Sequence, residues 1–122
     1  MMKQLDVHNL IKALHIFILS FPFPGEYDKI IRDQLCTSLI DIEQYHGCFK
    51  MLFKIDENAS VLPTTMPTLL QGGQILKDDG PISFQLFVEN GYVVQFEVVD
   101  MGLNEIDWDY FFQHNPIFDI KY

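Results

Sequence analysis

Basic residues are scarce in this chain of 122 residues. It has eight Lys and Arg against seventeen Asp and Glu, which gives a net charge of −9 at pH 7. Phosphate binding needs clustered lysine and arginine, so this balance argues against a nucleic-acid or anionic-membrane binder. The imbalance is largest in residues 62–122, which hold nine acidic residues but only Lys77 and Lys121. If the chain has a macromolecular partner, we expect a basic protein.

Cysteine is also scarce, with only Cys36 and Cys48. A chain of this length with 48% hydrophobic residues can bury its own core without a disulfide scaffold. The two thiols therefore predict a reducing compartment, and we expect a cytoplasmic protein. We expect the two cysteines at opposite ends of one hairpin, which is too far apart for a bridge.

The apolar N-terminal segment, residues 10–25, lacks the features of a membrane span and of a signal peptide. Its uncharged run, residues 13–24, is too short to span a bilayer and contains two prolines. A small-residue cleavage site is missing. We interpret the segment as an amphipathic helix packed on the domain.

Catalytic and metal-binding motifs are lacking as well. The four histidines are scattered, and none forms a spaced pair of the zinc-binding kind. Asp107, Asp109 and His114 could together bind a metal, but their spacing is unspecific. No serine lies in a nucleophile elbow, and Gly72-Gly73 lacks the context of a phosphate-binding loop. The sequence therefore predicts no catalytic residue, metal or cofactor, and favours a non-enzymatic protein.

Hydrophobic periodicity is the strongest signal that the sequence contains. Apolar residues recur at helical spacing over about residues 4–19, and the prolines of residues 21–25 end that helix. A shorter helix is predicted around 26–35, with Glu26 and Asp28 in its first turn. No internal repeat or linker divides the chain, so residues 1–122 are predicted to form a single domain.

From Cys36 onward the apolar pattern alternates, as it does in strands. Residues 38–45 and 48–56 predict a hairpin around the turn His46-Gly47. Residues 57–73 are predicted as a long loop with one helical turn near Leu69, and residues 74–77 as a short strand. The predicted fold is α+β: two N-terminal helices packed on a mostly antiparallel sheet of four or five strands, with a short C-terminal helical element.

The stretch FQLFVENGYVVQFEVVD (84–100) predicts a second hairpin. Strict alternation pairs Phe84 with Phe96 and Leu86 with Val94, which leaves a three-residue loop, 89–91. A two-residue Asn-Gly turn is rejected because it would mix the two faces of the hairpin. The opposite face is half polar, and its polar side chains are candidates for partner contact.

Acidic and aromatic residues interleave in the tail MGLNEIDWDYFFQHNPIF (101–118). Trp and Tyr surrounded by carboxylates are typical of a binding hot spot for a basic partner. Alternatively, Asn104 or Asp107 caps a short helix whose aromatic side chains fill the core. The sequence leaves both interpretations open. The predicted contact residues on the hairpin and the tail are Gln85, Gln95, Glu97, Asp100, Glu105, Asp107, Trp108, Asp109 and Tyr110.

Three stretches, DQL (33–35), YHGCF (45–49) and DDGPISFQLFVENGYVVQFEVVDMG (78–102), resemble in their order a group of small uncharacterised bacterial proteins. In that group a similar hairpin carries a turn glycine between an aromatic-rich strand and a strand rich in Leu and Glu. The likeness covers roughly residues 30–107. It implies an α+β fold and no particular activity.

A small, acidic, helix-then-sheet chain without a catalytic signature is also similar to immunity proteins of bacterial toxin systems, including contact-dependent growth inhibition. Those proteins neutralise a cognate toxin domain, often a basic nuclease, by covering or distorting its active site. The resemblance implies a basic toxin domain as partner, and it carries over no residue. The alternatives are a small-ligand-binding or metabolic accessory protein, which would use the concave sheet face under the helices, and an enzyme of unrecognised type.

Overall fold

The computed structural model describes residues 4–20, 25–36, 38–63 and 69–118. The elements in chain order are α1 (Gln4–Ser20), α2 (Gly25–Cys36), β1 (Leu39–Tyr45), β2 (Cys48–Lys54), β3 (Leu69–Ile75), β4 (Ile82–Glu89), β5 (Tyr92–Asp100), α3 (Trp108–Gln113) and β6 (Ile117–Phe118). The strands form one antiparallel sheet in the order β1-β2-β5-β4-β3-β6. The predicted α+β class is confirmed, with six strands in place of four or five.

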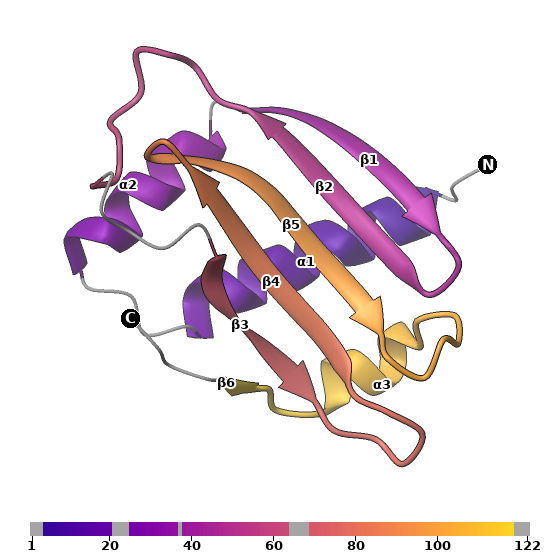
Figure 1. The fold of residues 1–122 in the computed structure, drawn as a ribbon. Helices are drawn as coiled ribbons and strands as arrows, with labels where there is room; N and C mark the ends of the chain where they lie inside the picture. Colours follow the sequence, from indigo (N-terminus) through magenta and orange to yellow (C-terminus); the bar gives the residue numbers. More distant parts are fainter. Residues whose placement is uncertain (1–3, 21–24, 37, 64–68, 119–122) are drawn as a thin grey trace.

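The helices lie on one face of the sheet, and the strands form the front layer in Figure 1. The core fills the space between these layers. Its fully buried side chains include Leu10 and Ile31 from the helices and Met51, Phe84 and Phe96 from the strands. Along β2 and β4 a buried residue alternates with a half-buried one, as expected where successive side chains point to opposite faces.

The two N-terminal helices agree with their predicted bounds. On α1, Leu10, Ala13 and Leu14 are buried, whereas Lys12 and His15 are exposed, so the helix is amphipathic. The prolines that were predicted to end α1 lie outside the described residues. None of the described helices combines the length and the apolar character needed to cross a membrane.

The β4–β5 hairpin has a register that differs from the predicted one. Glu89 pairs with Tyr92, so the connection is the two-residue turn Asn90-Gly91. Both turn residues have positive φ, 53° for Asn90 and 85° for Gly91, as a type I′ turn requires. The predicted three-residue loop was therefore wrong.

A β-bulge explains the error. Val88 pairs with Val93 and Phe87 with Gln95, which leaves Val94 as the extra residue. Strict alternation places Val93 on the polar face, but its side chain is fully buried. The bulge restores the apolar faces beyond the turn, which is why the two-residue turn does not mix them.

The segment around Leu69 is a strand, so the predicted helical turn there was wrong. Strand β3 pairs with β4 on one side and with β6 on the other. Gly72 lets two backbones approach closely, because a Cβ at this position would lie 1.7 Å from the carbonyl oxygen of Phe84. Pairing on both sides outweighs the low intrinsic strand propensity of glycine.

Candidate protein-binding surface

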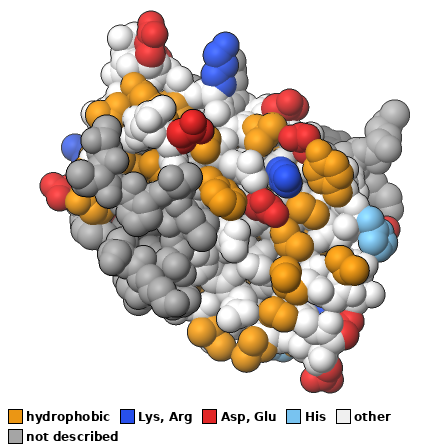
Figure 2. Space-filling view, viewed as in Figure 1, with side chains coloured by type: hydrophobic (Ala, Val, Ile, Leu, Met, Phe, Trp, Pro, Cys, Tyr) orange, Lys and Arg blue, Asp and Glu red, His pale blue; other side chains and the backbone are white. Residues whose placement is uncertain are grey.

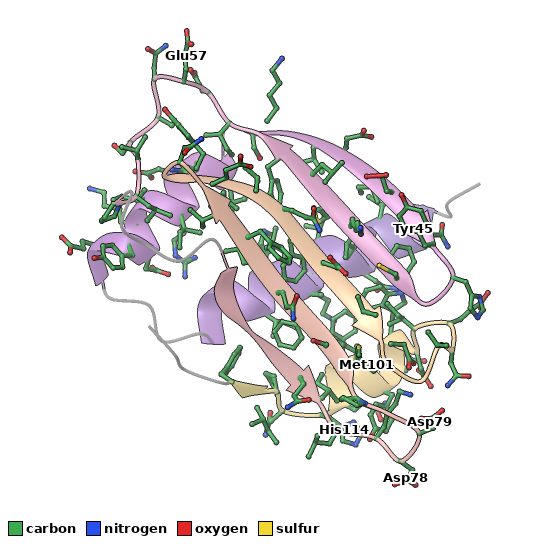
Figure 3. The ribbon with its side chains drawn as sticks, viewed as in Figure 1. Tyr45, Glu57, Asp78, Asp79, Met101 and His114 are labelled. Carbon is green, nitrogen blue, oxygen red and sulfur yellow. The ribbon has the colours of Figure 1, made fainter. Side chains whose placement is uncertain are left out.

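Two connections lie together at one end of the sheet: residues 76–81, between β3 and β4, and residues 101–107, between β5 and α3. We name this surface, together with the first turn of α3, the acidic loop end. Lys77 is the only basic residue in these segments. In Figure 3, Asp78, Asp79 and Met101 lie at this end, and Glu57 lies at the opposite end. The exposed carboxylates of the acidic loop end are those of Asp78, Asp79, Glu105, Asp107 and Asp109.

Asp100, the last residue of β5, links the two connections through its buried side chain. It is 1% exposed, and its Oδ1 accepts a hydrogen bond of 2.7 Å from the backbone N–H of Gly102. The same oxygen lies 3.0 Å from Nζ of Lys77, which also contacts Oδ1 of Asp79 at 2.6 Å. One lysine therefore holds a buried and an exposed carboxylate. The prediction that Asp100 belongs to an exposed contact surface was wrong.

Lys77 and Asp79 shift each other's ionisation. Their hydrogen bond raises the pKa of the Lys77 ammonium and lowers the pKa of the Asp79 carboxyl, so both charged forms are favoured at neutral pH. Nδ2 of Asn104 also donates to Oδ2 of Asp79. Asp79 is therefore an exposed carboxylate that is fixed in position by its neighbours.

Backbone contacts complete the link between the connections. The N–H of Met101 donates to the carbonyl of Pro81 at 2.9 Å, and the N–H of Asp100 donates to the carbonyl of Gly47 at 2.8 Å. A Cβ on Gly102 would lie 2.5 Å from the carbonyl oxygen of Asp79. Only glycine fits at this contact, so Gly102 sets how closely the two connections pack.

Large apolar side chains project from the same end. Leu103 is 73% exposed and Met101 is 58% exposed, and Leu76 and Tyr45 are also exposed. Leu103 has a φ of 62°, in the left-handed region that leucine rarely adopts. Such a conformation persists where the surrounding structure determines it, and it is frequent at binding sites. The acidic loop end therefore combines fixed carboxylates with exposed apolar groups.

The structure places the aromatic tail mainly in the core. The side chain of Asp107 caps α3 by accepting from the N–H of Tyr110 at 3.1 Å. Trp108 is 9% exposed and packs against Phe49, with ring centroids 5.7 Å apart. Trp108 is therefore a core residue, and its prediction as a contact residue was wrong. Tyr110 is half-buried, and its hydroxyl donates to the carbonyl of Leu76 at 2.6 Å.

The remaining predicted contact residues lie on the sheet face opposite the helices. Gln85 pairs with Glu97 across β4 and β5, and Nε2 of Gln95 donates to Oε2 of Glu97 at 2.9 Å. Sγ of Cys48 lies 3.8 Å from Oε1 of Glu97. Burial, and then the charge of Glu97, raises the pKa of the Cys48 thiol, which keeps it protonated and poorly nucleophilic. Figure 2 shows this face, where hydrophobic side chains are spread among scattered charges.

The structure thus separates the predicted contact residues into two groups. Glu105, Asp107 and Asp109 belong to the acidic loop end, whereas Gln85, Gln95 and Glu97 belong to the sheet face.

Several residues of the acidic loop end were missed from the sequence. Asp78 and Asp79 were not among the predicted contact residues. Met101 and Leu103 flank a glycine in a short connection, where neither helical nor strand periodicity assigns an apolar side chain to a core. That pattern was the available signal for an exposed apolar pair.

No family model, curated protein or solved structure matches this chain. Within the described part of the chain, no three or more His, Cys, Asp or Glu side chains are placed to hold a metal ion.

Proposed function

We propose that this chain is a non-enzymatic, cytoplasmic binding protein of the immunity type, which neutralises a basic, nuclease-like toxin domain by direct contact. The observation that carries the proposal is the acidic loop end, where exposed carboxylates and the exposed side chains of Met101 and Leu103 belong to one surface. Charge and apolar area have different roles in such an interface.

The carboxylates guide association. A surface of one sign raises the rate at which an oppositely charged partner arrives, and this effect falls with ionic strength. Carboxylates can also occupy the positions where a nuclease binds phosphate groups. The net charge of −9 adds to the attraction of a basic domain at long range.

The apolar side chains slow dissociation. Binding energy concentrates in a few well-packed side chains at the centre of an interface, with polar groups around them. Lys77, Asp100 and Asn104 hold the connections in place before any partner arrives. A surface that is already ordered loses less conformational entropy on binding.

The first test uses the proteins encoded on either side of this chain's gene. Each of them is expressed alone and together with this chain, and growth of the host is measured. We expect one of them to inhibit growth, growth to be restored by co-expression, and a complex of the two purified proteins that weakens as salt rises. Growth inhibition that persists with this chain present, or a complex insensitive to salt, would contradict the proposal.

The second test compares matched variants at the two ends of the molecule. Glu105→Lys at the acidic loop end is paired with Glu57→Lys at the opposite end, since both glutamates are exposed. At low salt we expect Glu105→Lys to slow association by about threefold or more relative to Glu57→Lys. Equal rates for the two variants would place the contact elsewhere.

A second pair of variants tests the contribution of the exposed apolar side chains to binding. Leu103→Ser is compared with Val61→Ser, because both side chains are exposed and apolar. Loss of a side chain at the centre of the contact is expected to raise the dissociation rate by about tenfold, whereas Val61→Ser leaves it unchanged. Surface plasmon resonance measures both rates. A larger effect of Val61→Ser would contradict the assignment.

A further inference from the structure

A cavity of about 440 Å³ lies between α1, α2 and the strands β1 and β2, on the helix side of the sheet. Its floor is apolar and consists of the buried side chains of Leu14, Met51 and Phe53. Its mouth is formed by side chains that are exposed, among them Ile40 and Cys36. This volume falls within the range of pockets that hold small organic ligands, about 300–1,000 Å³.

The polar groups that line the cavity are cationic or donate hydrogen bonds. Arg32, the single arginine of the chain, comes from α2, and His15 comes from α1. Among the described residues that line the cavity there is no carboxylate, although acidic residues outnumber basic ones about two to one in the whole chain. The cavity of this acidic protein is therefore lined by basic side chains and by no described acidic one.

Arg32 is held in place and keeps donors for a ligand. Its Nε bonds Oδ2 of Asp28 at 2.8 Å, one helical turn earlier. An exposed pair of this kind is weak, and the two terminal nitrogens carry the other N–H donors of the guanidinium. A guanidinium binds a carboxylate through two parallel hydrogen bonds, and His15, which lines the same cavity, offers an N–H in either tautomer.

We propose that this cavity binds a monoanionic amphiphile, a medium-chain alkyl carboxylate, with its chain on the apolar floor and its carboxylate at Arg32 and His15. An uncharged amphiphile would make no ion pair with the guanidinium of Arg32, and a cationic amphiphile would be repelled by it. This site uses none of the residues of the acidic loop end. Its ligand and the protein partner are therefore tested separately.

The first experiment uses the wild-type chain and its two cysteines. Cys36 lines the mouth of the cavity, whereas Cys48 begins β2 and contacts Glu97. Decanoate, added below its micellar concentration, is expected to slow alkylation of Cys36 in a saturable manner and to leave the rate at Cys48 unchanged. Mass spectrometry of the labelled peptides reports each thiol. No protection of Cys36, or equal protection of both thiols, would overturn the proposal.

The second experiment measures ligand selectivity by calorimetry. We expect decanoate to bind more tightly than decanol and much more tightly than decylammonium. Shortening the chain by one methylene is expected to weaken binding by about two- to fourfold, because each buried methylene contributes to the transfer free energy. Equal affinities for the anion and the cation, or no dependence on chain length, would overturn the proposal.

Variants locate the site. Arg32→Gln is expected to weaken decanoate binding by about tenfold or more while decanol is nearly unaffected, since only the charged bond is lost. Ile40→Glu adds a negative charge at the mouth and is expected to abolish decanoate binding. Val61→Glu is its matched control, because Val61 is equally exposed but does not line the cavity. Circular dichroism checks that each variant is folded. Equal binding by Ile40→Glu and Val61→Glu would overturn the proposal.

Discussion

The two ends of the sheet are each held by a buried polar side chain, but one is neutral and the other is charged. At the end that carries the Asn90-Gly91 turn, Gln34 of α2 is fully buried; at the acidic loop end, Asp100 is. Among the described residues, Gln34 and Asp100 are the only polar residues that are buried. Both residues join segments that are distant in the sequence, and they differ in what maintains the contact.

Gln34 hydrogen-bonds to backbone groups of the β2–β3 connection and of the β4–β5 hairpin. Its Nε2 donates to the carbonyls of Ser60 at 2.8 Å and Gly91 at 2.9 Å, and its Oε1 accepts from the N–H of Val93 at 2.8 Å. A neutral amide holds such contacts at any pH and any salt concentration. Asp100 is charged and contacts the ammonium of Lys77, so this contact weakens as the salt concentration rises. One fold thus combines a neutral anchor with a charged one.

Gln34→Leu is expected to produce the largest effect on stability. The variant leaves the buried N–H of Val93 without its acceptor and removes two further hydrogen bonds. We expect the free energy of unfolding to fall by about 3 kcal/mol, because buried groups that lose their partners are costly. Urea denaturation at pH 5, 7 and 9 measures it, and the loss should be the same at each pH.

Gln113→Leu is the control, since Gln113 is an exposed glutamine on α3. It is expected to change stability by less than about 0.5 kcal/mol. A loss in Gln34→Leu no larger than that of the control would mean that Gln34 does not anchor α2.

Gly102→Ala is expected to have the second-largest effect, and it acts at the opposite end. Its Cβ would lie 2.5 Å from the carbonyl oxygen of Asp79, so the two connections must separate. Forcing a methyl group into such a contact costs about 2 kcal/mol. Urea denaturation measures the loss, and binding of the protein partner should weaken with it. Unchanged stability would show that the connections adjust freely.

Asp100→Asn keeps the shape of the side chain and removes its charge. The amide oxygen can still accept from Gly102, but the charge-assisted contact with Lys77 is lost. We expect a loss of about 1 kcal/mol, the difference between charged and neutral hydrogen bonds. Thermal unfolding at two salt concentrations measures it. A variant as stable as the wild type would show that the ion pair with Asp79 alone is enough to hold Lys77.

Asp79→Asn has the smallest expected effect, and its signature is dependence on pH. The lowered pKa of Asp79 means that its ion pair stabilises the fold above the ordinary value of 3.8 and loses this contribution as the pH falls through the lowered value. The raised pKa of Lys77 adds stability below 10.5 that is lost as the pH rises through the raised value. The difference between variant and wild type should therefore be greatest between these limits. A difference that persists below pH 2 would contradict this account.

Periodicity predicted the elements better than their pairing. The bounds of α1 and α2 and the turn His46-Gly47 follow from patterns of neighbouring residues, and the structure agrees with them. The β4–β5 register failed because one bulge at Val94 changes the faces, and a bulge leaves no mark in local alternation. Strand β3 failed because its pairing with β4 and β6 is a long-range contact.

The candidate site was predicted in part for the same reason. The acidic residues of the tail mark a charged surface in the sequence alone. Their exposure, and the burial of Asp100 and Trp108 beside them, depends on Lys77 and Phe49, which come from other parts of the chain. The spacing of residues along the sequence does not predict such long-range contacts. The exposure of Met101 and Leu103 likewise depends on how the two connections pack against each other.

Two backbone amides of β5 report motion at the two ends of the sheet. The amide hydrogen of Val93 is donated to a side chain of α2, so its exchange with deuterium requires that helix to move away from the sheet. The amide of Asp100 bonds the carbonyl of Gly47, and its exchange reports separation of the β1–β2 turn from β5. The two rates, measured on one sample, distinguish departure of the helix from opening at the other end of the sheet. Opening events can thus be assigned to a place in the molecule as well as to a free energy.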